Sequence, residues 1–364
     1  MSRTPTNQFV PDYLVKPGEI LEEYLHVCGM TQAELASRTG LAKKTINEII
    51  KAKSPITPET ALKLERSLGR SANFWSSLER QYQEDKVRLA DKKRMANNLE
   101  WLKEFPIKEM AKLRWIRIFK DKFEQLDEIL HFFGVASPAQ WKKMWCDNEV
   151  AYRQTLCSDI KENSVFAWLR QGEICSKEIE CQPFDSKKFI GILHEIRALT
   201  NETPEIFVKQ LVSKCASTGV AVVFVPELPG MRTWGATRWL GDHAVIQLSL
   251  RYKSNDHLWF TFCHEAGHIL KHGRKQLFVE QKELKGEKEK EADDFAENFL
   301  ISPTELQNFL GQGEPTIGTV KNFACKIGIA PGIVVGRLQY DGVWKQNIGN
   351  GLKVYYEWKS PDKK

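Results

Sequence analysis

The peptide His264-Glu265-Ala266-Gly267-His268 has residue types and spacing that suit metal-dependent hydrolysis. On a helix, side chains four residues apart lie one turn above each other, so both imidazoles can bind the same Zn²⁺ ion. The carboxylate of Glu265 would project beside that ion, where it can take a proton from a water molecule. The apolar residues on both sides of the peptide predict that this helix is buried, and buried imidazoles without a metal would be costly. The pattern therefore predicts a zinc site with Glu265 as the general base of a metallopeptidase.

A catalytic zinc usually has three protein ligands and an open fourth position. His272 lies a further turn along the same rigid helix, so we do not expect it to reach the ion. The helix predicted from Glu287 offers a better donor, because Glu291 borders its inward-facing apolar stripe. Glu289 is the alternative, since docking shifted by one turn would direct it at the metal instead. The glutamates could also form only a solvated face.

The elements that must position these residues lie beyond residue 185, where the pattern changes from helical to mixed α/β. Helices are predicted over 186–199 and 204–217, and short β-branched runs predict buried strands over 219–226 and 244–249. A long apolar helix begins at Asp256, another helix is predicted from Glu287, and one or two more are predicted over 323–339. From 81 to 185 the sequence is helical and rich in tryptophan, and its aromatic residues are expected to form a core.

The sequence HEAGHILKH followed by EKEADDFAENFLIS resembles the ImmA/IrrE family of zinc metallopeptidases, whose pattern is H-E-x-G-H with a later E-A-(N/D)-x-F-A. The stretch from about residue 219 is similar to long-chain members of that family. The resemblance implies that proteins are the substrates, often helix-turn-helix repressors. It also implies Glu265 as base and zinc ligation by His264, His268 and Glu291.

One feature of short family members is absent. They often carry an arginine a few residues before the motif, whereas this chain has Asp256-His257-Leu258-Trp259. A residue that stabilises the transition state is therefore not assigned, and the candidates for polarising a carbonyl are Arg251, Tyr252 and His257.

The first eighty residues predict closely spaced short helices. Thr31 and Glu34 form a capping box, Gly40 ends that helix, and another helix follows from about 42 to 52. These lengths are typical of a helix-turn-helix, whose second helix enters the major groove of DNA. Lysines would neutralise phosphates and an asparagine could contact a base edge, although the same residues could form an ordinary charged face. The candidate DNA contacts are Gln32, Lys43, Lys44, Thr45, Asn47 and Lys51.

The segment from Val15 to Trp75 resembles the HigA-type antitoxins of the Xre superfamily. That resemblance implies a homodimer bound to a palindromic double-stranded DNA operator. It also implies autoregulation of an operon that encodes a cognate toxin.

Length and composition set limits on these interpretations. The chain has 364 residues, of which 42% are hydrophobic, which predicts two or three domains and excludes a disordered chain. It has neither a stretch long enough to cross a bilayer nor a signal core, so a cytoplasmic protein without membrane contact is expected. The net charge of +6 is mild, so DNA binding must rest on the local motif. The eight cysteines contain no C-x-x-C pair and are expected to be reduced core thiols.

The sequence thus predicts a multidomain protein: an all-α helix-turn-helix domain (1–80), a helical middle region (81–185) and an α+β zincin-like metallopeptidase domain (186–364). The favoured hypothesis is a DNA-binding regulator with a working zinc endopeptidase that cleaves a regulatory protein. The alternative is a non-catalytic antitoxin or repressor whose peptidase-like domain only binds a partner or senses a signal.

Overall fold

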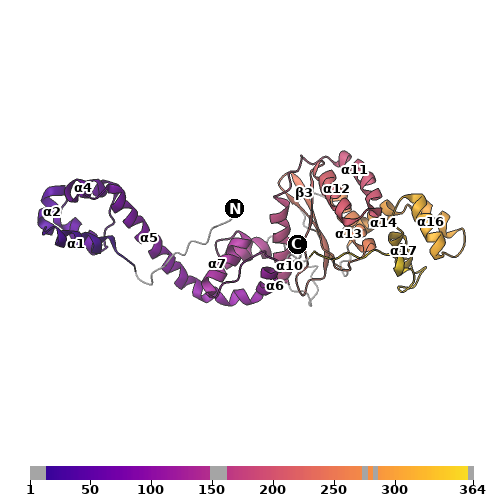
Figure 1. Cartoon of the computed structure of the whole chain (residues 1–364), viewed down its shortest axis with the longest axis horizontal. Helices are drawn as coiled ribbons and strands as arrows, with labels where there is room; N and C mark the ends of the chain where they lie inside the picture. Colours follow the sequence, from indigo (N-terminus) through magenta and orange to yellow (C-terminus); the bar gives the residue numbers. More distant parts are fainter. Residues whose placement is uncertain (1–13, 148–161, 273–277, 282–285, 360–364) are drawn as a thin grey trace. The chain divides into compact units, whose positions relative to one another are not determined.

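The computed structural model describes residues 14–147, 162–272, 278–281 and 286–359. The chain divides into two compact units, Met1–Asn98 and Leu99–Lys364. The expected boundary at residue 80 falls inside α5 (Ala72–Met95), which continues because neither glycine nor proline interrupts this segment. Figure 1 colours the elements of both units by their position in the sequence.

The first unit contains the predicted helix-turn-helix. Thr31 caps α2 (Gln32–Thr39) by accepting a hydrogen bond from the Glu34 backbone N–H at 3.1 Å. Gly40 ends the helix with a φ of 68°, which suits glycine, and α3 (Lys43–Ile50) follows after a short turn. With α1 (Pro17–Val27), α4 (Pro58–Leu68) and α5, these helices enclose a buried core that includes Leu35, Ile46, Ile49, Leu64 and Trp75. The predicted helical pair, the Thr31 cap and the Gly40 exit are confirmed. The full capping box is not, because the Glu34 carboxylate contacts Arg38 Nη2 at 2.6 Å.

The boundary between the units falls inside η1 (Ala96–Glu104). The second unit continues with α6 (Ile107–Lys112), α7 (Lys122–Phe133), α8 (Pro138–Trp141) and η2 (Lys142–Asp147). Aromatic side chains hold this region together, as expected. Trp101 and Trp141 are both buried, with ring centroids 5.4 Å apart, and Phe133 lies 5.6 Å from Trp141.

A four-stranded sheet forms the centre of the second unit. The strands are β1 (Val220–Phe224), β2 (Thr233–Leu240), β3 (His243–Leu248) and β4 (Phe278–Gln281), in the order β1-β3-β2-β4. β1 runs parallel to β3, whereas β2 is antiparallel to both β3 and β4. The predicted strands correspond to β1 and β3, and the structure adds β2 and β4.

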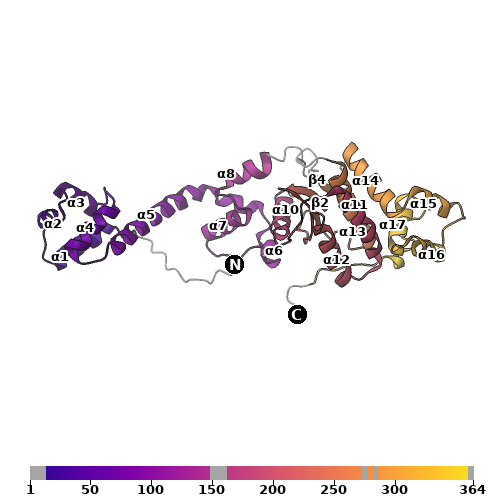
Figure 2. The ribbon, with the colours of Figure 1, turned by 90° about the horizontal axis from the view of Figure 1, so that it is seen from above.

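Helices cover both faces of the sheet, as two views show (Figures 1 and 2). α10 (Glu162–Ser176) lies on one face, where Trp168 Nε1 donates to the carbonyl of Val225 at 3.0 Å and Gln247 Nε2 donates to the Trp168 carbonyl at 2.7 Å. α12 (Pro204–Ala216) and α13 (Asn255–Lys271) contact the other face, with α11 (Ser186–Ala198) and η3 (Leu199–Asn201) beside them. The expected boundary at residue 185 therefore separates α10 from the sheet that it covers.

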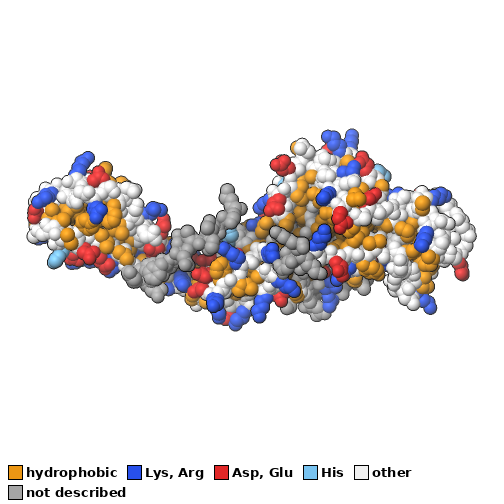
Figure 3. Space-filling view, viewed as in Figure 1, with side chains coloured by type: hydrophobic (Ala, Val, Ile, Leu, Met, Phe, Trp, Pro, Cys, Tyr) orange, Lys and Arg blue, Asp and Glu red, His pale blue; other side chains and the backbone are white. Residues whose placement is uncertain are grey.

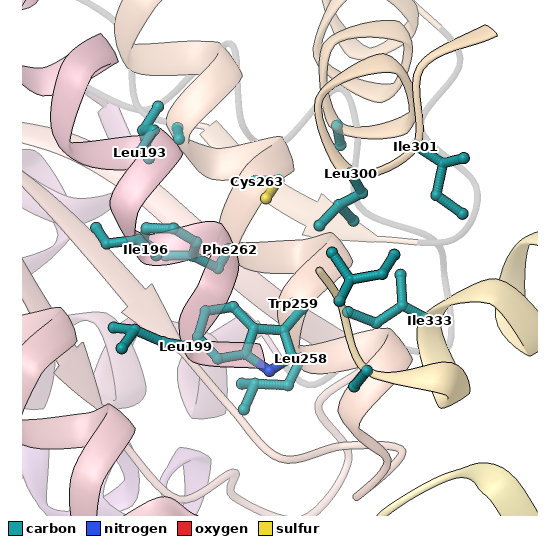
Figure 4. Packing of buried hydrophobic residues seen from close by; sticks show 14 of the residues in the cluster. Leu193, Ile196, Leu199, Leu258, Trp259, Phe262, Cys263, Leu300, Ile301 and Ile333 are labelled. Carbon is teal, nitrogen blue, oxygen red and sulfur yellow. The ribbon is translucent and has the colours of Figure 1, made fainter. Parts of the chain in front are cut away.

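The remaining elements are α14 (Glu287–Leu300), α15 (Pro303–Leu310), α16 (Ile317–Ile327), α17 (Pro331–Tyr340) and η4 (Asn350–Leu352). A single apolar core fixes α13 among them. Figure 4 shows Trp259 and Phe262 of α13 between Ile196 of α11 and Ile333 of α17, and all four are at least 96% buried. This packing makes α13 a rigid support for any side chain that it carries.

Two smaller expectations have mixed outcomes. Cys215 and Cys263 are buried free thiols and Cys175 and Cys181 are half-buried, but Cys28 and Cys325 are exposed, so the core assignment is wrong for those two. Cys157 and the side chain of Cys146 lie outside the described part of the chain. Among the described residues, none of the helices combines the length and apolar character that crossing a bilayer requires.

A buried ion pair anchors the first turn of α13. Lys353 Nζ lies 2.6 Å from Asp256 Oδ2 and 2.8 Å from Gln339 Oε1, and the side chains of the ion pair are each 8% exposed. We expect Lys353→Met to destabilise this unit by roughly 3–5 kcal/mol, because it leaves a buried carboxylate without its cation. Urea unfolding followed by tryptophan fluorescence measures the effect. Adding Asp256→Asn should restore part of the loss, and a Lys353→Met protein as stable as the parent would contradict the prediction.

Candidate functional site

α13 brings the predicted His264, Glu265 and His268 together inside the second unit. Their side chains are 2%, 0% and 1% exposed, and the two Nε2 atoms lie 2.9 Å apart. The i, i+4 spacing on a straight helix produces this convergence, as the sequence predicted.

The neighbouring helix α14 supplies a carboxylate to the same point. An added Cβ at Gly267 would lie 3.1 Å from a Phe295 ring atom and 3.2 Å from the Ala292 Cα, so this glycine permits the close approach of the two helices. Glu289 Oε2 then lies 3.3 Å from His264 Nε2 and 3.5 Å from His268 Nε2. Within the described part of the chain, the donor atoms of His264, His268 and Glu289 therefore converge here.

The expectation that Glu291 is the third ligand is contradicted by this geometry. Glu291 Oε2 lies 3.0 Å from His272 Nε2, so its carboxylate is directed at the end of α13. The reason is helical phase. Ala292 and Ala296 are fully buried against α13, and Glu289, three residues before Ala292, lies on the same face, whereas Glu291 lies on the flank.

Hydrogen bonds at the outer nitrogens orient both imidazoles. His264 Nδ1 lies 2.8 Å from Asp293 Oδ1, and because a carboxylate only accepts, Nδ1 must donate. By the same argument His272 Nε2 donates to Glu291. A neutral His272 then accepts through Nδ1 from His268 Nδ1, 2.9 Å away. With neutral imidazoles, the Nε2 atoms of His264 and His268 therefore both present lone pairs toward the point where they converge.

The protonation states agree with a cation-binding cluster. Burial lowers the pKa of His268, which favours the neutral imidazole that a metal requires. Burial alone would raise the pKa of Glu289, but hydrogen bonds from His264 and His268 in their protonated forms outweigh burial and lower the pKa to about 2. Glu289 is thus ionised at neutral pH.

The donor set fits a zinc ion. Two imidazole nitrogens and a carboxylate oxygen lie within 4.8 Å of one another. Ligands about 2.0–2.2 Å from a tetrahedral zinc are about 3.3–3.6 Å apart, close to the distances between Glu289 and the two histidines. The shorter separation of 2.9 Å between the Nε2 atoms requires only a small opening.

The carboxylate of Glu265 lies outside this donor set. Its side chain is fully buried and packs against β2, where an added Cβ at Gly235 would lie 2.6 Å from Oε1. Thr237 Oγ1 on the same strand donates to the Glu265 backbone carbonyl at 3.1 Å. Gly235 therefore provides the space that Glu265 occupies.

The three candidates for polarising a carbonyl lie before and at the start of α13. The rings of Tyr252 and His257 are 4.5 Å apart, and both lie near Trp234 of β2. Arg251 Nη1 donates to the Met231 carbonyl at 2.7 Å, so this nitrogen has a structural partner. None of the three is assigned a role by these contacts.

The candidate DNA contacts gather on α3 and at the start of α2. Lys43 and Lys44 are exposed and Asn47 is half-buried, whereas Ile46 and Ile49 of the same helix are buried. The Lys44 side chain is 85% exposed, with Glu48 3.9 Å away. Gln32 begins α2, Thr45 is half-buried on α3, and Lys51 directly follows that helix.

Two contributors to the site were missed from the sequence. Asp293 and His272 hold the outer nitrogens of His264 and His268. Both follow the spacing rule that identifies the motif, since Asp293 is four residues after Glu289 and His272 four after His268.

Comparisons with known proteins divide the chain in the same way. Residues 28–75 match the helix-turn-helix family, and residues 215–338 match the M78 peptidase family, described as the IrrE N-terminal-like domain. Virulence-associated protein I of Dichelobacter nodosus is 34% identical over 86 residues, which are 23% of this chain and 77% of that protein. The uncharacterized HTH-type transcriptional regulator YddM of Escherichia coli K12 is 31% identical over 64 residues, 18% of this chain and 68% of that protein.

Solved structures that resemble the chain correspond to about a quarter of it. The antitoxin HigA of Pseudomonas aeruginosa, solved with the higBA promoter, is 30% identical and covers 23% of this chain and 91% of its own, with a TM-score of 0.22. An addiction module antidote protein of a HigA family from Coxiella burnetii is 27% identical with the same coverage and a TM-score of 0.21.

Proposed function

We propose that this protein is a DNA-binding transcriptional regulator with a zinc-dependent endopeptidase. The chain belongs to the helix-turn-helix family through residues 28–75, and it carries an IrrE N-terminal-like domain at residues 215–338. The observation that carries the enzymatic half is the convergence of His264, His268 and Glu289 beside the buried Glu265. The proposed substrate is a regulatory protein, such as a helix-turn-helix repressor.

The chain's own residues define the proposed reaction. His264, His268 and Glu289 would hold Zn²⁺, and when bound, the ion would activate a water molecule and polarise the peptide carbonyl. Glu265 would accept the proton of the attacking water and pass it to the leaving amine. Asp293 and His272 would keep the two imidazoles in the tautomer that leaves Nε2 available.

Zinc analysis and a cleavage assay test the enzymatic half. We expect about one zinc ion per chain in the purified protein and cleavage of an unfolded protein such as casein or of a helix-turn-helix repressor. A folded protein that neither retains nor takes up zinc would contradict the proposal. Cleavage that persists after zinc is removed by a chelator would contradict it as well.

The DNA-binding half rests on the exposed face of α3. Its proposed partner is an operator, and we propose that two copies bind the two half-sites of a palindrome, with a cognate toxin as a further partner. A promoter-binding assay on the protein's own upstream region tests this half. Failure to bind that region at low salt would contradict autoregulation.

Replacing Lys43 and Lys44 by Ala should flatten the salt dependence of operator binding. The slope of log K against log salt should fall by about 0.9 for each phosphate that the variant no longer neutralises, because fewer counterions are released. Affinities measured at several salt concentrations give this slope. The control is Lys63→Ala with Arg66→Ala on α4, which removes the same charge elsewhere in the unit. A slope unchanged from that of the parent protein would show that the α3 lysines do not contact phosphate.

A further inference from the structure

A cavity of about 180 Å³ lies between α13, α14, α17 and β2 in the second unit. Its walls are mainly apolar and include Trp234, Phe260, Leu300 and Ile333. Hydrophobic side chains also reach the surface in the region of α13, α14 and α17 (Figure 3). The cavity is thus suited to an apolar group rather than to a charged one.

This cavity adjoins the proposed zinc site. Phe260, in its wall, precedes His264 by one helical turn, and the two ring centroids are 6.4 Å apart. Glu297 also lies in the wall, one helical turn after Asp293, and the Asp293 carboxylate accepts a hydrogen bond from His264. A peptide bond placed at the His264 and His268 nitrogens would therefore have a neighbouring side chain within reach of the cavity.

The charges in the wall compensate one another. Arg337 Nη2 lies 3.1 Å from Glu297 Oε2, and Arg337 Nε lies 2.8 Å from Asp341 Oδ2. Two carboxylates therefore compensate the charge of this guanidinium, which weakens its attraction for an acidic side chain of a substrate, although its buried Nη1 has no hydrogen-bond partner among the described residues. The cavity is also large enough for an aromatic ring, since an engineered apolar cavity of about 150 Å³ holds benzene.

We propose that this cavity binds a phenylalanine or another aromatic side chain of the protein substrate, next to the bond that is cleaved. The inference rests on the proposed peptidase function and names the substrate feature that this site selects. Burial of one aromatic side chain should improve binding by roughly 10- to 100-fold over alanine at the same position.

Peptide binding tests the proposal without requiring cleavage. Zinc-loaded full-length Glu265→Gln protein is titrated calorimetrically with acetylated, amidated alanine peptides that carry one Phe, Lys or Glu, or only Ala. We expect the Phe peptide to bind at least about ten times more tightly than the all-Ala peptide. Equal affinities, or a preference for Lys or Glu, would overturn the proposal.

A cavity-filling variant locates the effect. Ile333→Phe in the Glu265→Gln background should abolish the preference for Phe while the all-Ala peptide and zinc bind as before. Ile317→Phe on α16, where Ile317 is 45% exposed and outside the cavity, is the matched control and should retain the preference. If Ile333→Phe still prefers the Phe peptide, the aromatic side chain does not bind in this cavity. If Ile333→Phe loses zinc through misfolding, Leu300→Phe replaces it under the same criteria.

The two levels of the proposal fail in different ways. If Glu265→Gln binds Phe peptides selectively but the parent protein cleaves no substrate, the proposed peptidase activity is contradicted and the cavity assignment still holds. Cleavage without any preference for aromatic residues would support the peptidase and overturn the cavity assignment.

Discussion

Replacing Glu265 by Gln is expected to lower the rate of peptide-bond cleavage by roughly 10²- to 10⁴-fold while the protein still binds one zinc ion. Gln has nearly the same size and would fill the space beside Gly235, but its amide cannot take a proton from water. The zinc ligands are other residues, so the metal content should not change. Cleavage and zinc content are measured on the same preparation.

A matched control removes the same charge elsewhere. Glu287 is exposed at the start of α14, so Glu287→Gln should cleave at the parental rate. If Glu265→Gln retained full activity, Glu265 could not be the base. If it lost zinc as well as activity, the missing metal alone would account for the loss, and the role of Glu265 would have to be withdrawn.

Local signals predicted the parts of the fold that depend on neighbouring residues. The Thr31 cap, the Gly40 exit and the apolar spacing on α3 lie within a few turns of the residues that they position. The same holds for His264 and His268, because one straight helix fixes their separation. Such features need no knowledge of tertiary packing.

Features that depend on distant contacts were predicted less well. β2 was not identified as a strand because its sequence, TWGATRWL, does not show the short β-branched run of β1. α10 was assigned to the middle region, although hydrogen bonds from Trp168 and Gln247 fix it to a sheet more than fifty residues later. The register of α14 against α13 also depends on distant contacts, and it decides which glutamate is the third zinc ligand.

Glu289→Gln should therefore weaken zinc binding far more than Glu291→Gln, although both changes remove one carboxylate from α14. Glu289 Oε2 lies 3.3 and 3.5 Å from the converging nitrogens, and its low pKa keeps it ionised. Glu291 acts only through His272. Removing an outer partner of this kind typically lowers metal affinity by roughly 10- to 100-fold at most.

Competition with a chromophoric chelator measures the zinc affinity of both variants, and circular dichroism with operator binding verifies that each is folded. A Gln at position 291 can still accept the hydrogen bond from His272, which limits its effect to the lower end of that range. A Gln at position 289 keeps a carbonyl oxygen but loses the charge that the cation attracts. The opposite ranking, with Glu291→Gln losing the metal and Glu289→Gln retaining it, would mean that α14 docks one turn away from the register described above.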